Sequence, residues 1–129
     1  YRHVIVQEFC PEVGNGDLVA TFFDGRHLGT MRRLPNDNEW KTNASLGAVE
    51  VACTLSCGLE DIAKKVTEGY PGCRFSSVDM LESGKVLEIN AFPGGNGLLK
   101  THGISVGKII MDQIEKDAYM HFEYGTKTA

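Results

Sequence analysis

The chain has 129 residues, of which 42% are hydrophobic and 23% are charged, and its formal net charge is −4. This length and composition are typical of one globular domain with a core of its own. The acidic balance argues against a broad basic surface for nucleic acid, and no apolar run is long enough to span a bilayer. We therefore expect neither a nucleic-acid nor a membrane partner.

Short apolar runs predict strands over residues 4–10, 18–23 and 27–34. The dipeptide Asp24-Gly25 predicts a two-residue hairpin turn between the second and third strands, because such turns need positive φ. Residues 49–55 alternate between apolar and polar side chains, which fits either a strand or an extended connection. A strand pattern that begins at once also suggests that the 129 residues, read as a single domain, are a fragment of a longer chain.

Ser56 is a plausible helix N-cap, because apolar side chains at helical spacing follow it as far as Gly69. Two more strands are expected over residues 75–81 and 86–90, and a glycine-rich loop over 91–103. The last predicted helix is capped by Ser105, and its expected buried face consists of Val106, Ile109, Ile110 and Ile114. These elements predict an α+β domain in which helices pack on one face of an antiparallel sheet.

The hairpin over residues 75–90 has a register that its side chains can test. Closing a four-residue turn pairs Leu81 with Val86 and sets Asp79 opposite Glu88. One face of the hairpin then carries Val78, Met80, Leu87 and Ile89, and the other carries Ser77, Asp79, Glu88 and Asn90. A shift by one residue would mix the two faces, so the pattern supports this register.

Two carboxylates placed directly opposite each other repel, and a proton, a basic side chain or a metal ion would relieve the repulsion. Two carboxylates and an amide oxygen are hard ligands, so Asp79, Glu88 and Asn90 form a candidate magnesium site. Two alternatives stay open, namely an ordinary solvated strand face and an acid–base pair with one raised pKa. The glycine-rich tract after Asn90 favours the metal, because its backbone N–H groups can approach a phosphate closely.

The basic residues near the first hairpin and the four cysteines are two further groups of side chains with a chemical interpretation. If the Asp24-Gly25 hairpin closes tightly, Asp17 faces Arg32; together Arg32, Arg33 and Lys41 form either a solvated face or a set that meets polyphosphate. The cysteines at 10, 53, 57 and 73 do not have the spacing of a zinc site, and a chain with a good core needs no disulfides. We expect free thiols and a cytoplasmic location.

Several segments together, in order and with near-correct spacing, resemble the ATP-grasp ligases. The likeness runs from about Val4 to Ile114 and is strongest at the Asp and Glu-x-Asn positions. The segments are Val6-Gln7-Glu8-Phe9, Gly16-Asp17, Asp24-Gly25, Arg33-Leu34-Pro35, Glu39-Trp40-Lys41-Thr42-Asn43, Gly47-Ala48, Ser77-Val78-Asp79-Met80, Val86-Leu87-Glu88-Ile89-Asn90 and Pro93-Gly94. The most similar branches are bacterial glutathione synthetases and the glutamate ligases that modify a ribosomal protein.

The resemblance implies a role for each matching residue. Glu8 and Phe9 match the hinge that meets adenine, Asp17 the residue that meets ribose, and Arg33 an arginine near the phosphates or the acyl phosphate. Lys41, Thr42 and Asn43 match a segment that touches the nucleotide, and Asp79, Glu88 and Asn90 match the magnesium ligands. The implied cofactors are ATP and magnesium, with manganese as a substitute.

The implied reaction joins a carboxylate to an amine through an acyl phosphate made from ATP. The substrates would be small molecules or peptides, and the resemblance leaves a homodimer open. The likeness covers the C-terminal lobe of the ATP-grasp fold, so the N-terminal lobes of the same chain should precede Tyr1 and this piece alone should be inactive. A departure occurs at Val19, where the nearest branches usually carry arginine.

Two other hypotheses compete with a ligase. The chain could be a non-catalytic ATP-grasp remnant that binds a nucleotide or a partner, which Val19 favours and the intact Asp79, Glu88 and Asn90 set opposes. It could also be a plain α+β scaffold with solvated acids on a strand face.

Overall fold

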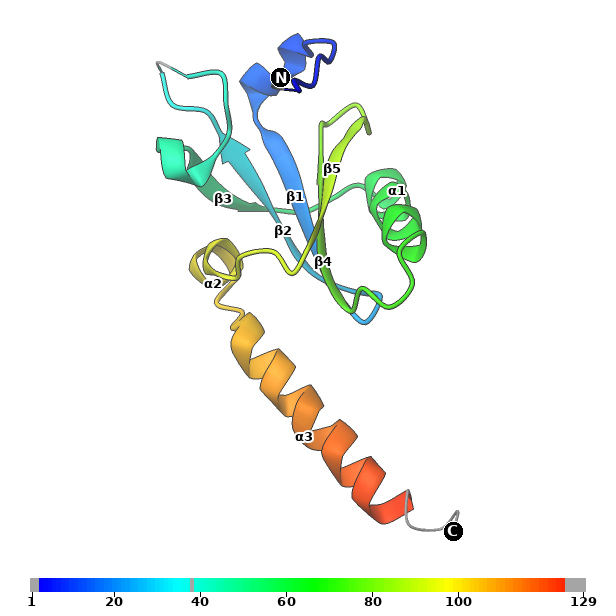
Figure 1. Ribbon diagram of the computed structural model, residues 1–129. Coiled ribbons are helices and arrows are strands. Elements are labelled where there is room, and N and C mark those ends of the chain that lie inside the picture. Colours follow the sequence, from blue (N-terminus) through cyan, green and yellow to red (C-terminus); the bar gives the residue numbers. More distant parts are fainter. Residues whose placement is uncertain (1–2, 38, 125–129) are drawn as a thin grey trace. The chain divides into compact units, whose positions relative to one another are not determined.

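The computed structural model describes residues 3–37 and 39–124, and Figure 1 shows its elements. Five strands form one antiparallel sheet in the order β3-β2-β1-β4-β5, which confirms the predicted α+β class. The strands are β1 (Asp17–Phe23), β2 (Arg26–Leu34), β3 (Val49–Cys53), β4 (Phe75–Met80) and β5 (Val86–Ala91). The helices of the described residues are α1 (Cys57–Glu68), α2 (Asn96–His102) and α3 (Val106–Tyr124), with short 3-10 helices η1 (Pro11–Asn15) and η2 (Ala44–Leu46).

The chain divides into two compact units, residues 1–93 and 94–129. The first unit holds the sheet and α1, and the second holds α2 and α3. The expectation of a single domain stays a prediction.

The core of the first unit lies on one face of the sheet. β1 is the central strand, and all seven of its residues are buried. The core cluster comprises Leu18, Ala20, Phe22, Leu55, Ala63, Val78 and Met80. Because Ala63 belongs to α1, this helix packs on the apolar face, and Figure 1 shows it beside β4 and β5. Burial of Phe22 or Met80 contributes about 1.5–3 kcal/mol each.

α1 begins where the sequence predicts. The Ser56 hydroxyl accepts a hydrogen bond from the backbone N–H of Leu59 at 3.4 Å, which satisfies one of the free donors of the first turn. The helix ends at Glu68, before Gly69. Residues 49–53 form a strand, β3, which decides between the two alternatives for that segment.

The strand predicted over residues 4–10 is wrong. This segment has no regular secondary structure, and Val4, Ile5 and Val6 are each at least four-fifths exposed. A strand needs a neighbour to pair its backbone groups, and the sheet of the described residues offers this segment none.

Two expectations for the second unit need correction. The predicted loop over residues 91–103 contains α2, in which Leu98 is buried and Thr101 donates to the Gly97 carbonyl at 2.8 Å. Burial of an apolar side chain here outweighs the helix-breaking tendency of glycine. In α3 the Ser105 hydroxyl accepts from the Lys108 N–H at 3.3 Å, as expected for a cap. Val106 is buried, but Ile114 is 53% exposed and does not belong to a buried face.

A bulge in the β1–β2 hairpin changes the pairing expected for Asp17. The Asp24-Gly25 turn has positive φ at both residues, as predicted, but the register shifts between Thr21 and Phe22, so that Asp17 pairs with Arg33. The prediction that Asp17 faces Arg32 is therefore wrong. The extra residue moves the rest of β2 by one position and reverses which arginine shares a face with Asp17.

A second bulge alters the β4–β5 hairpin. The pairs of Ser77 with Asn90, of Val78 with Ile89 and of Asp79 with Glu88 are confirmed. Beyond Asp79 the register shifts, so Met80 pairs with Val86 and Leu87 becomes the extra residue. The predictions that Leu81 faces Val86, that Met80 faces Leu87 and that Leu87 joins the apolar face are therefore wrong. A bulge shifts the register and re-aims the side chain of its extra residue.

The four cysteines are free thiols, as predicted. Over residues 3–37 and 39–124, no helix has both the length and the apolar character that crossing a membrane requires.

Candidate functional site

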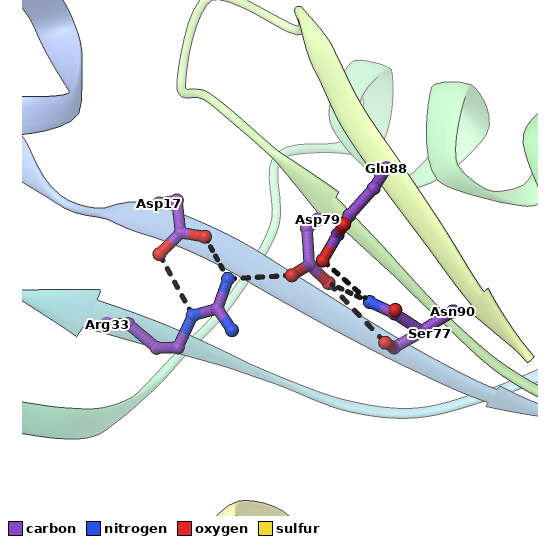
Figure 2. Close-up of polar contacts among 6 residues, drawn as sticks. All are labelled: Asp17, Arg33, Ser77, Asp79, Glu88 and Asn90. Carbon is purple, nitrogen blue, oxygen red and sulfur yellow. Dashed lines mark hydrogen bonds and ion pairs between the residues drawn. The ribbon is translucent and has the colours of Figure 1, made fainter. Parts of the chain in front are cut away.

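The polar face of the β4–β5 hairpin gathers the residues predicted to bind metal. Asp79 is buried on β4, while Glu88 and Asn90 lie opposite on β5. The Asn90 amide Nδ2 donates to Asp79 Oδ1 at 3.4 Å and to Glu88 Oε1 at 3.1 Å. The Ser77 hydroxyl also donates to Asp79 Oδ1, at 3.4 Å. Figure 2 shows these side chains converging on Asp79.

Arg33 joins this cluster from the other side of β1. Its Nε donates to Asp17 Oδ1 at 3.1 Å, and its Nη2 donates to both Asp17 Oδ2 and Asp79 Oδ2, the latter at 2.6 Å. One guanidinium thus bridges two buried carboxylates (Figure 2). The bulge in β2 makes this possible, because without it Arg33 would not pair with Asp17.

The backbone before β1 is shaped to admit Arg33. Gly16 has φ +87°, and a Cβ added there would lie 2.5 Å from the Arg33 carbonyl oxygen. Only glycine fits this conformation and this approach without displacing the backbone. The Gly16-Asp17 dipeptide therefore fixes the first residue of β1 against β2.

The cluster has an excess of negative charge, since three carboxylates share it with one guanidinium. Burial raises the pKa of the Asp79 carboxyl; the Arg33 cation opposes this shift, while Asp17 and Glu88 add to it. For Arg33, burial acts to lower the pKa, but hydrogen bonds and charges from Asp17 and Asp79 outweigh it and raise the pKa. Arg33 therefore stays charged, and the cluster favours a further cation.

The donor set fits a hard divalent cation. Within residues 3–37 and 39–124, no group of three or more His, Cys, Asp and Glu side chains is arranged to hold a metal by itself. Asp79, Glu88 and Asn90 instead offer two carboxylates and an amide, and magnesium usually completes such a set with water and phosphate. The Asn90 amide N–H group donates to both carboxylates. It therefore occupies the space between two negative charges, where electrostatics favours positive charge.

A pocket of about 470 Å³ lies beside this hairpin and collects five of the six predicted nucleotide-binding residues. Those residues are Glu8, Phe9, Lys41, Thr42 and Asn43, while Asp17 is not part of the lining. The apolar part of the lining consists of Ile5, Phe9, Val13, Trp40, Leu81 and Leu87. A slot with apolar walls and a few polar groups suits a flat, partly polar ligand.

Aromatic contacts shape one wall of the pocket. The Phe9 and Trp40 rings meet edge to face with centroids 5.6 Å apart. The Lys41 ammonium lies 5.5 Å from the centre of the Trp40 ring. The contact between Phe9 and Trp40 joins the two segments of the chain, residues 8–10 and 40–43, that line the pocket.

The turn between β4 and β5 supports the same segment. The Ser83 hydroxyl donates to Glu12 Oε1 at 2.7 Å, and Lys85 Nζ donates to Cys10 Sγ at 3.2 Å. Lys85 Nζ also lies 3.9 Å from a Glu8 carboxylate oxygen. The pocket wall is therefore tied to the hairpin that carries Asp79 and Glu88.

The structure does not bring Arg32, Arg33 and Lys41 together in one cluster. Arg32 donates to Glu82 and to the Asn15 carbonyl, each at 3.0 Å, while Arg33 faces Asp17 and Asp79. Neighbouring residues of a strand point to opposite faces, which separates the two arginines. Lys41 lies at the pocket instead.

Sequence reasoning missed Leu87 and Trp40 as lining residues. Leu87 precedes Glu88 and reaches the pocket because of the β4–β5 bulge, which no local pattern foretells. The sequence could have indicated Trp40, because an apolar ring in a polar, loop-like segment often marks a binding surface.

Comparisons with known proteins identify the family of the chain. A family model described as the RimK-like ATP-grasp domain matches residues 1–114. A probable alpha-L-glutamate ligase from Haemophilus influenzae is 32% identical over 121 residues, which are 92% of this chain and 40% of that protein. A relative of the same description from Xylella fastidiosa is 30% identical over 119 residues, or 90% of this chain and 39% of that protein. The chain thus spans about 40% of the length of these relatives.

Solved structures show the same fold. The ATP-grasp ligase PsnB complexed with a minimal precursor matches with a TM-score of 0.55 and 17% identity, over 80% of this chain and 35% of that chain. PsnB complexed with a phosphomimetic variant of the minimal precursor, Mg and ADP matches with a TM-score of 0.56 and 18% identity, over 78% and 32%.

The family match covers most of the chain, and the sheet agrees with that of known ATP-grasp ligases. The chain belongs to the RimK-like ATP-grasp domain family.

Proposed function

We propose that this chain forms the nucleotide- and magnesium-binding part of an ATP-dependent carboxylate–amine ligase. The observation that carries the proposal is the position of the Asp79, Glu88 and Asn90 cluster. It adjoins, through Leu87, a pocket that collects five residues expected to bind a nucleotide. Polyphosphate between the two would meet the base-binding pocket at one end and a cation site at the other.

The pocket would hold the adenine ring. The apolar side chains of Phe9, Trp40 and Leu87 suit its faces, and backbone groups of Glu8 and Phe9 suit its polar edge. Lys41, Thr42 and Asn43, which also line the pocket, would bind the ribose or the phosphates. Asp17 would not bind the ribose, because the residue is buried and both of its carboxylate oxygens accept hydrogen bonds from Arg33.

Asp79, Glu88 and Asn90 would hold magnesium, and manganese should substitute because it accepts the same donors. When bound, the ion would neutralise charge on the transferring phosphoryl group. Arg33 would help from the other side, since its guanidinium stays charged and has two N–H groups, on Nη1, without a partner among the described residues. Positioning and charge stabilisation of this kind are the main demands of phosphoryl transfer.

The proposed reaction has two steps. A substrate carboxylate takes the γ-phosphoryl group of ATP and becomes an acyl phosphate, with ADP as the leaving group. An amine then attacks the acyl carbon, so that an amide forms and phosphate leaves. The relatives named alpha-L-glutamate ligase and the PsnB complex with a precursor make peptide or small-molecule carboxylates and amines the substrate classes to test.

The remaining expectations are proposals as well. We infer that the chain is part of a longer ligase, because it spans only about 40% of its relatives. A cytoplasmic location, a homodimer and the lack of nucleic-acid and membrane partners stay predictions.

A non-catalytic remnant is the second candidate. Val19, at the place where arginine is expected, is buried between Met31 and Asp79 in the sheet register and supplies no charge to a phosphate. Such a protein would bind a nucleotide with magnesium but would form no acyl phosphate.

One experiment separates the two candidates. The full-length protein is incubated with Mg–ATP, glutamate or glutamyl peptides, and hydroxylamine as the trapping amine. A ligase forms hydroxamate and ADP in equal amounts, and Glu88→Gln lowers that rate by about 100-fold or more. Glu82→Gln, an equal substitution at the exposed partner of Arg32, should leave the rate unchanged. Binding of Mg–ADP without hydroxamate would support the remnant, and neither activity nor binding would refute both.

A further inference from the structure

Asp17 is buried, and among the described residues its carboxylate has one hydrogen-bonding partner, Arg33. The residue is 0% exposed, and both of its carboxylate oxygens accept hydrogen bonds from Arg33. The Arg33 side chain is 18% exposed, and its Nη2 also donates a hydrogen bond to Asp79. One arginine therefore joins two carboxylates, and the second of them, Asp79, also accepts hydrogen bonds from Ser77 and Asn90 (Figure 2).

The donors of Arg33 divide into two groups. A guanidinium has five N–H donors in one plane. Three of them, on Nε and Nη2, are bound to Asp17 and Asp79. Because the group is planar, a two-point contact with Asp17 also fixes the direction of Nη1, whose donors have no partner among the described residues.

Fold stability alone does not account for this pair. Burying two ions costs solvation energy, and apolar side chains of similar volume usually stabilise a core at least as well. The neighbouring positions in the register, Val19 and Met31, are apolar and buried. A carboxylate at position 17 is thus explained better by a need to orient the arginine.

We infer that Asp17 is a positioning residue that holds Arg33 so that Nη1 faces the transferring phosphoryl group while Nη2 contacts Asp79. Asp17 touches neither nucleotide nor metal and acts only through Arg33. The inference rests on the proposed function for the identity of the group that Nη1 faces, the transferring phosphoryl group. The binding of a guanidinium by Asp17 can be measured without ATP.

The first test uses guanidinium as a probe in the full-length protein. Arg33→Ala removes the side chain and leaves Asp17 and Asp79 facing a space of guanidinium size. Millimolar guanidinium chloride should raise the melting temperature of Arg33→Ala by about 2 °C relative to the same concentration of sodium chloride. The double variant Asp17→Asn/Arg33→Ala should show no rise. A rise of equal size in both variants, or none in Arg33→Ala, would overturn the inference.

The second test uses turnover. Asp17→Asn should lower kcat by about 10- to 100-fold and leave KM for ATP within about 3-fold, because a misplaced Arg33 affects the phosphoryl step more than nucleotide binding. In the Arg33→Ala background the same substitution should add no further loss. Additive losses, or a loss confined to KM, would contradict a positioning role.

A matched control is available at the other end of the sheet. Arg74 also donates two hydrogen bonds to one aspartate, Asp24, both at 2.7 Å, but that pair is exposed. Asp24→Asn should leave kcat unchanged. If the wild-type protein shows no turnover, the proposed function fails, while the guanidinium measurement still decides whether Asp17 positions a cation.

Discussion

Glu88 and Asp79 face each other across β4 and β5, and within the described part of the chain the Asn90 amide is the one hydrogen-bond donor that contacts both. Although Arg33 contacts Asp79, the two facing carboxylates still repel each other when no metal ion is bound. The same pair stabilises the folded protein when it binds a divalent ion. A single substitution should therefore change stability in opposite directions in the two conditions.

Glu88→Gln should raise the free energy of unfolding by about 0.2–1 kcal/mol in a chelating buffer, because it removes one of two facing charges. With Mg–ADP at about 100 times its Kd, the wild-type protein gains about 2.7 kcal/mol by mass action, and the variant should lose most of that gain. Urea denaturation of both proteins with and without Mg–ADP measures the difference. A variant that is equally or more stable in both conditions would indicate a plain scaffold with solvated acids.

Cys53 offers a test of the electrostatics away from the site. Burial raises its pKa, Glu82 adds to the shift and Arg32 opposes it. A raised folded-state pKa means that folding favours the neutral thiol, so the stabilisation is present at neutral pH and is lost as pH rises through that pKa. Alkylation of Cys53 by iodoacetamide, followed by mass spectrometry, should accelerate at a higher pH than that of free glutathione. An equal or lower midpoint would contradict this assignment.

At the scale of elements, two bulges decide the composition of the site. Alternation of apolar and polar residues predicted both hairpins and three of the pairs between β4 and β5. It could not predict the extra residue in each hairpin, because a bulge depends on twist and on contacts between strands. One bulge exchanges Arg32 for Arg33 beside Asp17, and the other turns Leu87 toward the pocket.

Long-range contacts explain the other differences from the sequence predictions. Residues 4–10 have the apolar pattern of a strand but no pairing partner in the described sheet. In α2, Gly97 lies within a helix because Leu98 is buried. The facing carboxylates were predicted from the register of the hairpin, and the structure places them opposite each other. The resemblance to ATP-grasp ligases, not local spacing, indicated the five predicted residues that line one pocket, and their roles stay predictions.

Gly16→Ala should destabilise the fold by about 1–3 kcal/mol. The new Cβ would lie 2.5 Å from the Arg33 carbonyl oxygen, and φ there is +87°. Gly14→Ala is the control, because an added Cβ at Gly14 meets nothing within 4 Å, and its effect should stay within about 0.5 kcal/mol. Thermal or urea unfolding compares the two. Equal effects would mean that the junction before β1 does not depend on Gly16.

At the scale of the whole molecule, one compact unit carries both halves of the proposed site. Residues 8–10, 40–43, 81 and 87 line the pocket, and Asp79, Glu88 and Asn90 form the cluster beside it. The chain spans about 40% of the relatives that it matches. We therefore propose that this unit binds the base and the cation, and that substrate choice depends on the complete protein.

The most direct test of this account is a calorimetric titration of Mg–ADP into the full-length protein, with Asp79→Asn and Glu88→Gln in parallel. ADP is the ligand of choice because turnover cannot contribute heat. The account predicts binding that requires magnesium and weakens at least about 10-fold in both variants. Binding that is indifferent to magnesium and to both substitutions, or no binding to the wild-type protein, would contradict it.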